Sequence, residues 1–162
     1  MKTLLLMRHA KANFADSAGQ DHARTLNGRG RRAAPVMGEL LGRSGVAPDY
    51  IITSTAARAL ETAQAVAEAV GYDGPVTLMK SLYLAEPQAY LEALLDVPAR
   101  AQIVLMVGHN PGISDLVELL SGEPREMPTA AIAALELPLS EFSAISPETR
   151  GQLTQFWRPR DV

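Results

Sequence analysis

The chain contains no cysteine, and this absence narrows the chemistry that is open to it. A disulfide framework, a thiolate zinc site and a thiol nucleophile are all excluded. A composition without cysteine also suits a reducing compartment, so we expect a cytoplasmic protein.

Long apolar runs are missing as well. No stretch approaches the roughly 20 apolar residues that a membrane-spanning helix needs, so we expect no membrane partner. The apolar run at the amino terminus meets Arg8 and His9 too early for a secretory signal, and it is interpreted as a first strand. We expect the 162 residues to form one domain, 1–162, and to be monomeric because no coiled-coil heptad pattern is present.

Basic residues are not in excess either. The formal net charge is −3 and the isoelectric point is near 5.6, which argues against nucleic acid as a partner. The local exception is the segment 24–32, which has four arginines in nine residues. Two interpretations of this segment stay open, a solvated helix start and a rim that steers anions.

The sequence does contain alternating strand and helix patterns. Continuous aliphatic runs predict parallel strands over 3–7, 50–53 and 103–107, and a shorter one over 76–78. Apolar stripes at helical spacing lie within 33–42, 56–70, 87–95 and 111–122. Pro35 falls inside the first of these stripes, where it is expected to kink the helix or to postpone its start.

The pattern changes after Pro128. Apolar residues alternate over 131–137, which predicts a strand, and residues 152–157 are expected to form a closing antiparallel edge. The polar stretch from Ala15 to Ala23 is expected to be a mobile loop over the first histidine. Together the elements predict an α/β fold, a three-layer α/β/α sandwich with a mostly parallel mixed central sheet.

Two of the predicted strands end in a histidine. Arg8 and His9 follow the first strand, and His109 follows the strand over 103–107. Arg58 lies in the first turn of the helix after the second strand, so it faces the same edge of the sheet, where open α/β sheets bind ligands. Two guanidiniums beside two imidazoles form an anion pocket, and the planar fork of arginine matches phosphate oxygens. The sequence therefore predicts a phosphoryl site.

An unprotonated histidine at such a site can attack phosphorus in line, while cations and the helix start at 110–112 offset the charge on the oxygens. This chemistry needs no metal and no other cofactor. A metal site would require His9, His22, His109 and a carboxylate to converge, and the neighbouring arginines oppose a bound cation.

The segment 6–11, Leu-Met-Arg-His-Ala-Lys, resembles the signature of the histidine phosphatase superfamily, in the Arg-His-Ala form common in its small SixA-type branch. The resemblance continues through Arg24-x-Leu26-x-x-x-Gly30, Ser54-x-x-x-Arg58-Ala59-x-x-Thr62-Ala63, Gly108-His109-Asn110-Pro111 and Pro128-Thr129-Ala130. Several motifs in order over most of the chain are a specific signal. The resemblance implies a phosphoglycerate-mutase-like fold, with His9 as the phosphorylated nucleophile. It also implies that Arg8, Arg58 and His109 bind and stabilise the phosphoryl group.

Other residues are candidates for contacts to the substrate. Arg24 and Ser54 belong to the motifs, and Asn13 either donates to phosphate or caps a local turn. Lys11 either steers anions or is simply exposed. His22 is expected to be exposed, with lining of the substrate entrance as the alternative.

Glu86 is the carboxylate nearest to the place where larger members of the superfamily carry a glutamate proton donor. It either donates a proton or simply favours the helix start at Pro87. Without a donor, the enzyme favours a good leaving group such as the imidazole of phosphohistidine. We therefore expect a hydrolase of protein phosphohistidine or a related phosphoramidate. The alternatives are a phosphatase of a small phosphomonoester that uses Glu86 as general acid, and a phosphoryl-binding module without catalysis.

Overall fold

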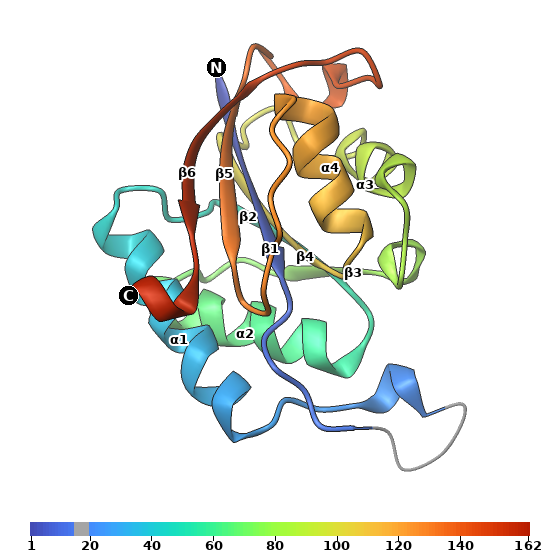
Figure 1. Ribbon diagram of the computed structural model, residues 1–162. Helices are drawn as coiled ribbons and strands as arrows, with labels where there is room; N and C mark the ends of the chain where they lie inside the picture. The colour runs from blue at the N-terminus through green and yellow to red at the C-terminus, as the bar shows by residue number, and fades with distance from the viewer. Residues whose placement is uncertain (15–19) are drawn as a thin grey trace.

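The computed structural model describes residues 1–14 and 20–162 and contains one six-stranded sheet (Figure 1). The strands are β1 (Lys2–Arg8), β2 (Tyr50–Ser54), β3 (Val76–Met79), β4 (Ile103–Gly108), β5 (Ile132–Leu137) and β6 (Gln152–Trp157). Their order in the sheet is β3-β2-β4-β1-β5-β6. Strands β1 to β4 pair in parallel, whereas β5 and β6 are antiparallel to their neighbours, which confirms the predicted mixed sheet.

Two helices cover each face of the sheet (Figure 1). They are α1 (Gly28–Arg43) and α2 (Ala57–Val70) on one face, and α3 (Pro87–Leu94) and α4 (Gly112–Ser121) on the other. Four short 3-10 segments complete the described part: η1 (Asp21–Ala23), η2 (Lys80–Leu82), η3 (Phe142–Ala144) and η4 (Pro159–Asp161). The predicted three-layer sandwich is confirmed. None of the helices described is long and apolar enough to cross a bilayer.

Strand β1 runs through the centre of the molecule, and this explains its continuous apolar sequence. Leu4 and Leu6 pack into the core beneath α3 and α4, whereas Leu5 and Met7 pack into the core beneath α1 and α2. All four side chains are fully buried. A strand buried on both faces has no polar positions to alternate with apolar ones.

Helix α1 corrects one expectation. It begins at Gly28, well before Pro35, so the proline does not postpone its start. Asn27 sets this start, because its side-chain oxygen accepts a hydrogen bond of 2.9 Å from the backbone N–H of Gly30. Pro87 is the first residue of α3, as expected, and Gly71 and Gly122 follow the last residues of α2 and α4 in the left-handed conformation.

The register of β1 and β4 places the ends of these neighbouring strands side by side. Arg8 pairs with Gly108, and the backbone N–H of His9 donates to the carbonyl oxygen of Gly108 at 3.1 Å. The next residues, His9 and His109, therefore leave the sheet at the same carboxyl edge. This edge is where a crevice forms in open α/β sheets.

Candidate active site

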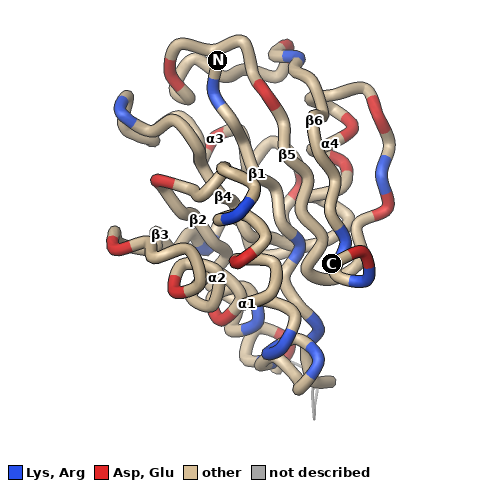
Figure 2. Tube along the Cα trace, turned by 90° about the vertical axis from the view of Figure 1, so that its left-hand side faces the viewer, with Lys and Arg blue, Asp and Glu red and all other residues tan. Residues whose placement is uncertain are grey.

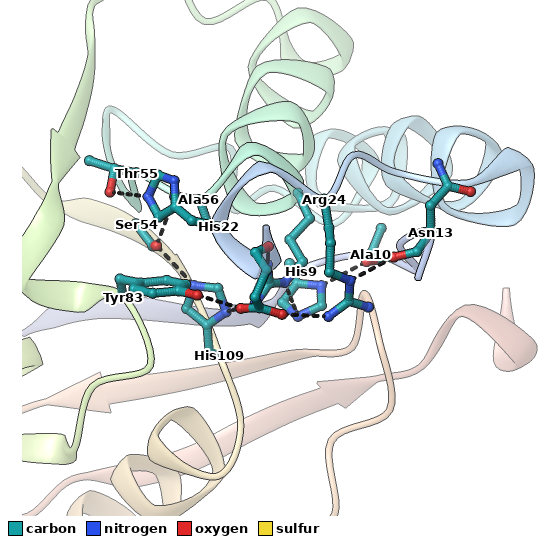
Figure 3. A network of polar contacts seen from close by, with 12 residues as sticks. His9, Ala10, Asn13, His22, Arg24, Ser54, Thr55, Ala56, Tyr83 and His109 are labelled. Carbon is teal, nitrogen blue, oxygen red and sulfur yellow. Dashed lines mark hydrogen bonds and ion pairs between the residues drawn. The ribbon is translucent and has the colours of Figure 1, made fainter. Parts of the chain in front are cut away.

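The two histidines that end β1 and β4 face each other. The centroids of the His9 and His109 rings are 5.2 Å apart, and both side chains lie in one polar network (Figure 3). His9 is 8% exposed and His109 is 1% exposed. Segments a hundred residues apart in the chain thus supply one site, as the sequence predicted.

Hydrogen bonds fix the orientation of the His9 ring. Its Nδ1 lies 2.7 Å from the carbonyl oxygen of Ala10, which can only accept, so Nδ1 carries the proton. The lone pair of Nε2 faces Arg58, whose Nε–H donates to it at 3.4 Å. Burial lowers the pKa of His9 to about 4, and the charges of nearby arginines add to the shift. His9 is therefore neutral at physiological pH, with Nε2 available as a nucleophile.

Arg58 reaches the site from the first turn of α2 and is 3% exposed. One terminal nitrogen donates to the backbone oxygen of Asp21 at 2.7 Å. The other donates to Oδ2 of Asp21 at 3.0 Å and lies 3.4 Å from Nδ1 of His109. The guanidinium is thus held between the two imidazoles, with its position set by η1.

Hydrogen bonds to Ser54 and Tyr90 hold His109 in place. Because Nδ1 faces the Arg58 donor, Nε2 carries the proton and donates to the hydroxyl of Ser54 at 2.8 Å. The backbone N–H of His109 donates to the Tyr90 hydroxyl at 3.1 Å. Burial lowers the pKa of His109 to about 3, with further contributions from His9 and Arg58. Ser54 therefore bonds to the ring nitrogen of His109 that does not face Arg58.

Arg8 supplies a second guanidinium. One of its terminal nitrogens donates to the carbonyl oxygen of Met127 at 3.0 Å. Its Nε is buried and has no hydrogen-bond partner among the described residues. A buried donor of a cation normally finds an acceptor, and an unmatched one at such a site points to an anionic ligand.

These side chains line a pocket of about 340 Å³. Its lining residues are Arg8, His9, Lys11, Ala12, Phe14, Asp21, Arg24, Arg58, Leu84, His109, Asn110 and Thr129. Four of them are lysine or arginine and one is a carboxylate, so the pocket suits an anion. Within residues 1–14 and 20–162, no group of three histidine or acidic side chains is arranged to hold a metal ion.

Asp21 and Tyr83 belong to the site, although the sequence analysis did not select them. The carboxylate of Asp21 pairs with Arg24 at 2.9 Å and with Arg58 at 3.0 Å, and it accepts a hydrogen bond from the Tyr83 hydroxyl. The bonds from Tyr83 and Arg24 hold the pKa of Asp21 well below its usual range. Asp21 comes from the polar stretch that was expected to be a mobile loop. Residues 15–19 of that stretch lie outside the described residues, whereas Asp21 is anchored in η1.

The remaining candidates lie at different places. Arg24 lines the pocket, but Asn13 turns its amide to Thr25 and the carbonyl oxygen of Leu26, as expected for a residue that holds a local turn. Glu86 is exposed at the start of α3 and is not among the residues that line the pocket. His22 is exposed and lies 2.8 Å from the Thr55 hydroxyl, at the edge of the Tyr83 ring.

Comparison with known proteins identifies the family. The model of the histidine phosphatase superfamily, branch 1, matches residues 4–83. A Mycobacterium tuberculosis protein described as uncharacterized is 36% identical over 115 residues, which cover 71% of this chain and 70% of that protein.

Two solved structures extend the likeness over nearly the whole chain. A structure described as a putative phosphohistidine phosphatase SixA from Agrobacterium tumefaciens has a TM-score of 0.82 and 30% identity, and covers 98% of each chain. A second, from Nakamurella multipartitia and described in the same terms, has a TM-score of 0.79 and 29% identity, and covers 98% of this chain and 96% of the other. The chain therefore belongs to the histidine phosphatase superfamily, and its fold resembles that of SixA proteins from end to end.

Proposed function

We propose that the protein is a phosphatase that hydrolyses phosphohistidine in a protein, or a related phosphoramidate, through a covalent intermediate on His9. The observation that carries this proposal is the orientation of His9, whose neutral imidazole presents Nε2 to a pocket of cationic side chains. Membership of the histidine phosphatase superfamily and the likeness to SixA structures support it.

In the first step, the lone pair of His9 Nε2 attacks phosphorus and the bond from phosphorus to the leaving nitrogen breaks. Because Nδ1 holds its proton against the carbonyl oxygen of Ala10, the ring keeps its position as Nε2 becomes bonded. Arg8 and Arg58 line the pocket beside His9, where their guanidiniums offset the negative charge on the oxygens of the transferring group. His109 helps to hold Arg58 in place, because its Nδ1 lies 3.4 Å from a terminal nitrogen of that guanidinium. Water then attacks the phosphorus of phosphorylated His9 and the bond between phosphorus and Nε2 breaks. Phosphate leaves with the protons of the water, and the neutral imidazole is restored.

The carboxylates in and near the pocket indicate which leaving group the site can accept, because a poor leaving group needs a proton donor. Asp21 is the carboxylate of its lining, and its pKa lies well below the usual range, so it stays ionised and does not donate a proton. Glu86 is exposed outside the lining, which gives little support to a role as general acid. An alkoxide needs such an acid, whereas an imidazole leaves with much less protonation. Phosphohistidine is therefore a better match to the site than a phosphomonoester.

The proposal is tested with a histidine-containing peptide that has been phosphorylated chemically. We expect the protein to release phosphate from it in the presence of a metal chelator, and a rapid quench to trap a phosphoenzyme that is labile in acid. His9→Ala should abolish both signals. His22→Ala is the matched control, because it removes an exposed imidazole outside the pocket lining. No release by the wild-type protein, or equal release by His9→Ala, would refute the proposal.

A further inference from the structure

Two further pockets adjoin the active-site pocket. One, of about 490 Å³, shares Arg8 and Asn110 with it. The other, of about 280 Å³, shares Lys11 and Thr129 with it. The two pockets adjoin each other, because Pro128, Arg158 and Arg160 line both of them. We call these two pockets together the arginine groove.

The groove is strongly basic. Its cationic residues are Arg8, Lys11, Arg29, Arg125, Arg158 and Arg160, and Glu126 is the carboxylate of its lining. The chain as a whole has a net charge of −3, so positive charge is concentrated on this side. Figure 2 shows several blue segments near the carboxyl terminus and the start of α1, with others elsewhere along the chain.

Part of this charge is not neutralised by ion pairs among residues 1–14 and 20–162. Arg125 pairs with Glu123 at 2.9 Å and Arg158 with Asp161 at 2.8 Å. No ion pair between described residues involves Lys11, Arg29 or Arg160. Arg29 and Arg160 are also exposed, so their guanidiniums are open to an external anion.

The uncharged part of the lining indicates whether the groove suits a nucleic acid or an acidic polypeptide. Beside the cationic residues, the lining includes the apolar residues Ala33, Pro111, Met127, Pro128 and Pro159. The described lining includes no aromatic side chain, so it offers no platform for stacking a base. A lining that combines small apolar surfaces with guanidiniums suits a polypeptide that carries carboxylates.

We propose that the arginine groove docks an acidic polypeptide segment that flanks the phosphohistidine of a protein substrate. The inference rests on the proposed function and specifies the substrate: the phosphorylated residue enters the active-site pocket while neighbouring Asp and Glu side chains lie in the groove. Arg8 lines both the groove and the active-site pocket, so the two sites are contiguous. Positive potential beside the site raises the rate of encounter with an acidic partner and selects against a basic one.

The experiment compares two synthetic peptides that each contain one phosphohistidine, flanked either by glutamates or by glutamines. We expect kcat/KM for the glutamate peptide to be about tenfold higher at low salt, through KM, and the ratio to shrink as ionic strength rises. Arg29→Gln/Arg160→Gln should reduce this ratio about threefold to tenfold. Arg43→Gln/Arg100→Gln makes the same change in net charge with exposed residues at the opposite edge of the sheet and should leave the ratio unchanged.

Equal kcat/KM for the two peptides, or a preference that survives Arg29→Gln/Arg160→Gln, would overturn docking while leaving the proposed reaction intact. If neither peptide is hydrolysed, the proposed reaction is refuted, and docking is tested separately by fluorescence anisotropy with the unphosphorylated glutamate peptide. The wild-type protein should bind this peptide, and the Arg29→Gln/Arg160→Gln variant should bind it more weakly. Absence of that binding would overturn docking. Tighter binding of a single-stranded oligonucleotide of equal charge would also overturn it, in favour of a nucleic-acid partner.

Discussion

The imidazole of His9 stays neutral because it is buried among cations, and this sets its titration. Its pKa is lowered to about 4, so protonation in the range where free imidazole titrates is suppressed. We expect ring NMR signals of ¹⁵N-labelled His9, assigned by comparison with His9→Asn, to stay those of the neutral form from pH 8 down to about pH 5. The shift toward the cationic form should come only near the lowered value. An inflection close to pH 6.5 would contradict this assignment.

Asp21 positions the cations of the site, since its carboxylate bonds to both Arg24 and Arg58. Asp21→Asn keeps the shape of the side chain but removes its charge, so both guanidiniums lose their ionic partner. We expect about a tenfold loss in kcat/KM, a change of roughly 1.4 kcal/mol, together with weaker inhibition by vanadate and only a small change in melting temperature. Asp115→Asn, which changes a carboxylate on α4 outside this pocket, is the control. Unchanged vanadate inhibition in Asp21→Asn would show that the carboxylate has no positioning role.

At the scale of the elements, α4 packs closely against the connection before α3, and this contact helps to position His109, which lies just before α4. A Cβ added at Gly112, the first residue of α4, would overlap the backbone oxygen of Ala85. Gly112→Ala therefore forces α4 and the connection before α3 apart, and we expect it to destabilise the protein by about 2 kcal/mol or more and to reduce activity.

The matched substitution is Gly42→Ala in α1, where an added Cβ meets nothing within 4 Å. It should stabilise the fold by about 0.5 kcal/mol, because alanine favours the helix over glycine. Melting temperature and kcat/KM of both variants give the comparison. Equal stability of the two variants would mean that the helix and the connection do not constrain each other.

The elements themselves were largely predictable from local patterns. The aliphatic run of β1 predicts a strand buried on both faces, and Gly71 and Gly122 mark helix ends because glycine accepts the left-handed conformation. Local signals failed at Pro35, where the cap at Asn27 and the buried face of α1 determine the helix start instead.

The parts of the site that were not predicted depend on contacts between distant segments. Asp21 meets Arg58 and Tyr83 only after the chain folds, and neither Asp21 nor Tyr83 lies in a motif or a periodic pattern. His9 and His109 were predictable because each follows a recognisable strand, and parallel strands end at a common edge. Their roles in the reaction remain predictions that the His9→Ala and peptide experiments test.

At the scale of the whole molecule, the two cores share the central sheet. Leu4 and Leu5 are adjacent in β1, yet they belong to the cores on opposite faces, so neither core can be lost without disturbing the same strand. We therefore expect residues 1–162 to unfold as one domain in a single cooperative transition. Urea unfolding followed by the fluorescence of Trp157, on the edge strand β6, should coincide with the loss of helix measured by circular dichroism. Separate midpoints would indicate independent units.

The buried histidines also link the stability of the whole molecule to pH. The pKa values of His9 and His109 are lowered from 6.5 to about 4 and about 3. Between pH 6.5 and these lowered values, the two histidines bind protons in the unfolded chain but not in the folded protein. The free energy of unfolding is therefore highest above pH 6.5 and falls as the pH drops toward 4. The two groups together contribute a slope of at most about 2.7 kcal/mol per pH unit. Urea unfolding at steps between pH 8 and pH 4 should show a slope that becomes shallower in His9→Asn/His109→Asn and is retained largely intact in His22→Asn. If His9→Asn/His109→Asn kept the full slope, the acid sensitivity would have to come from other groups, and the two imidazoles would not be held neutral by the fold.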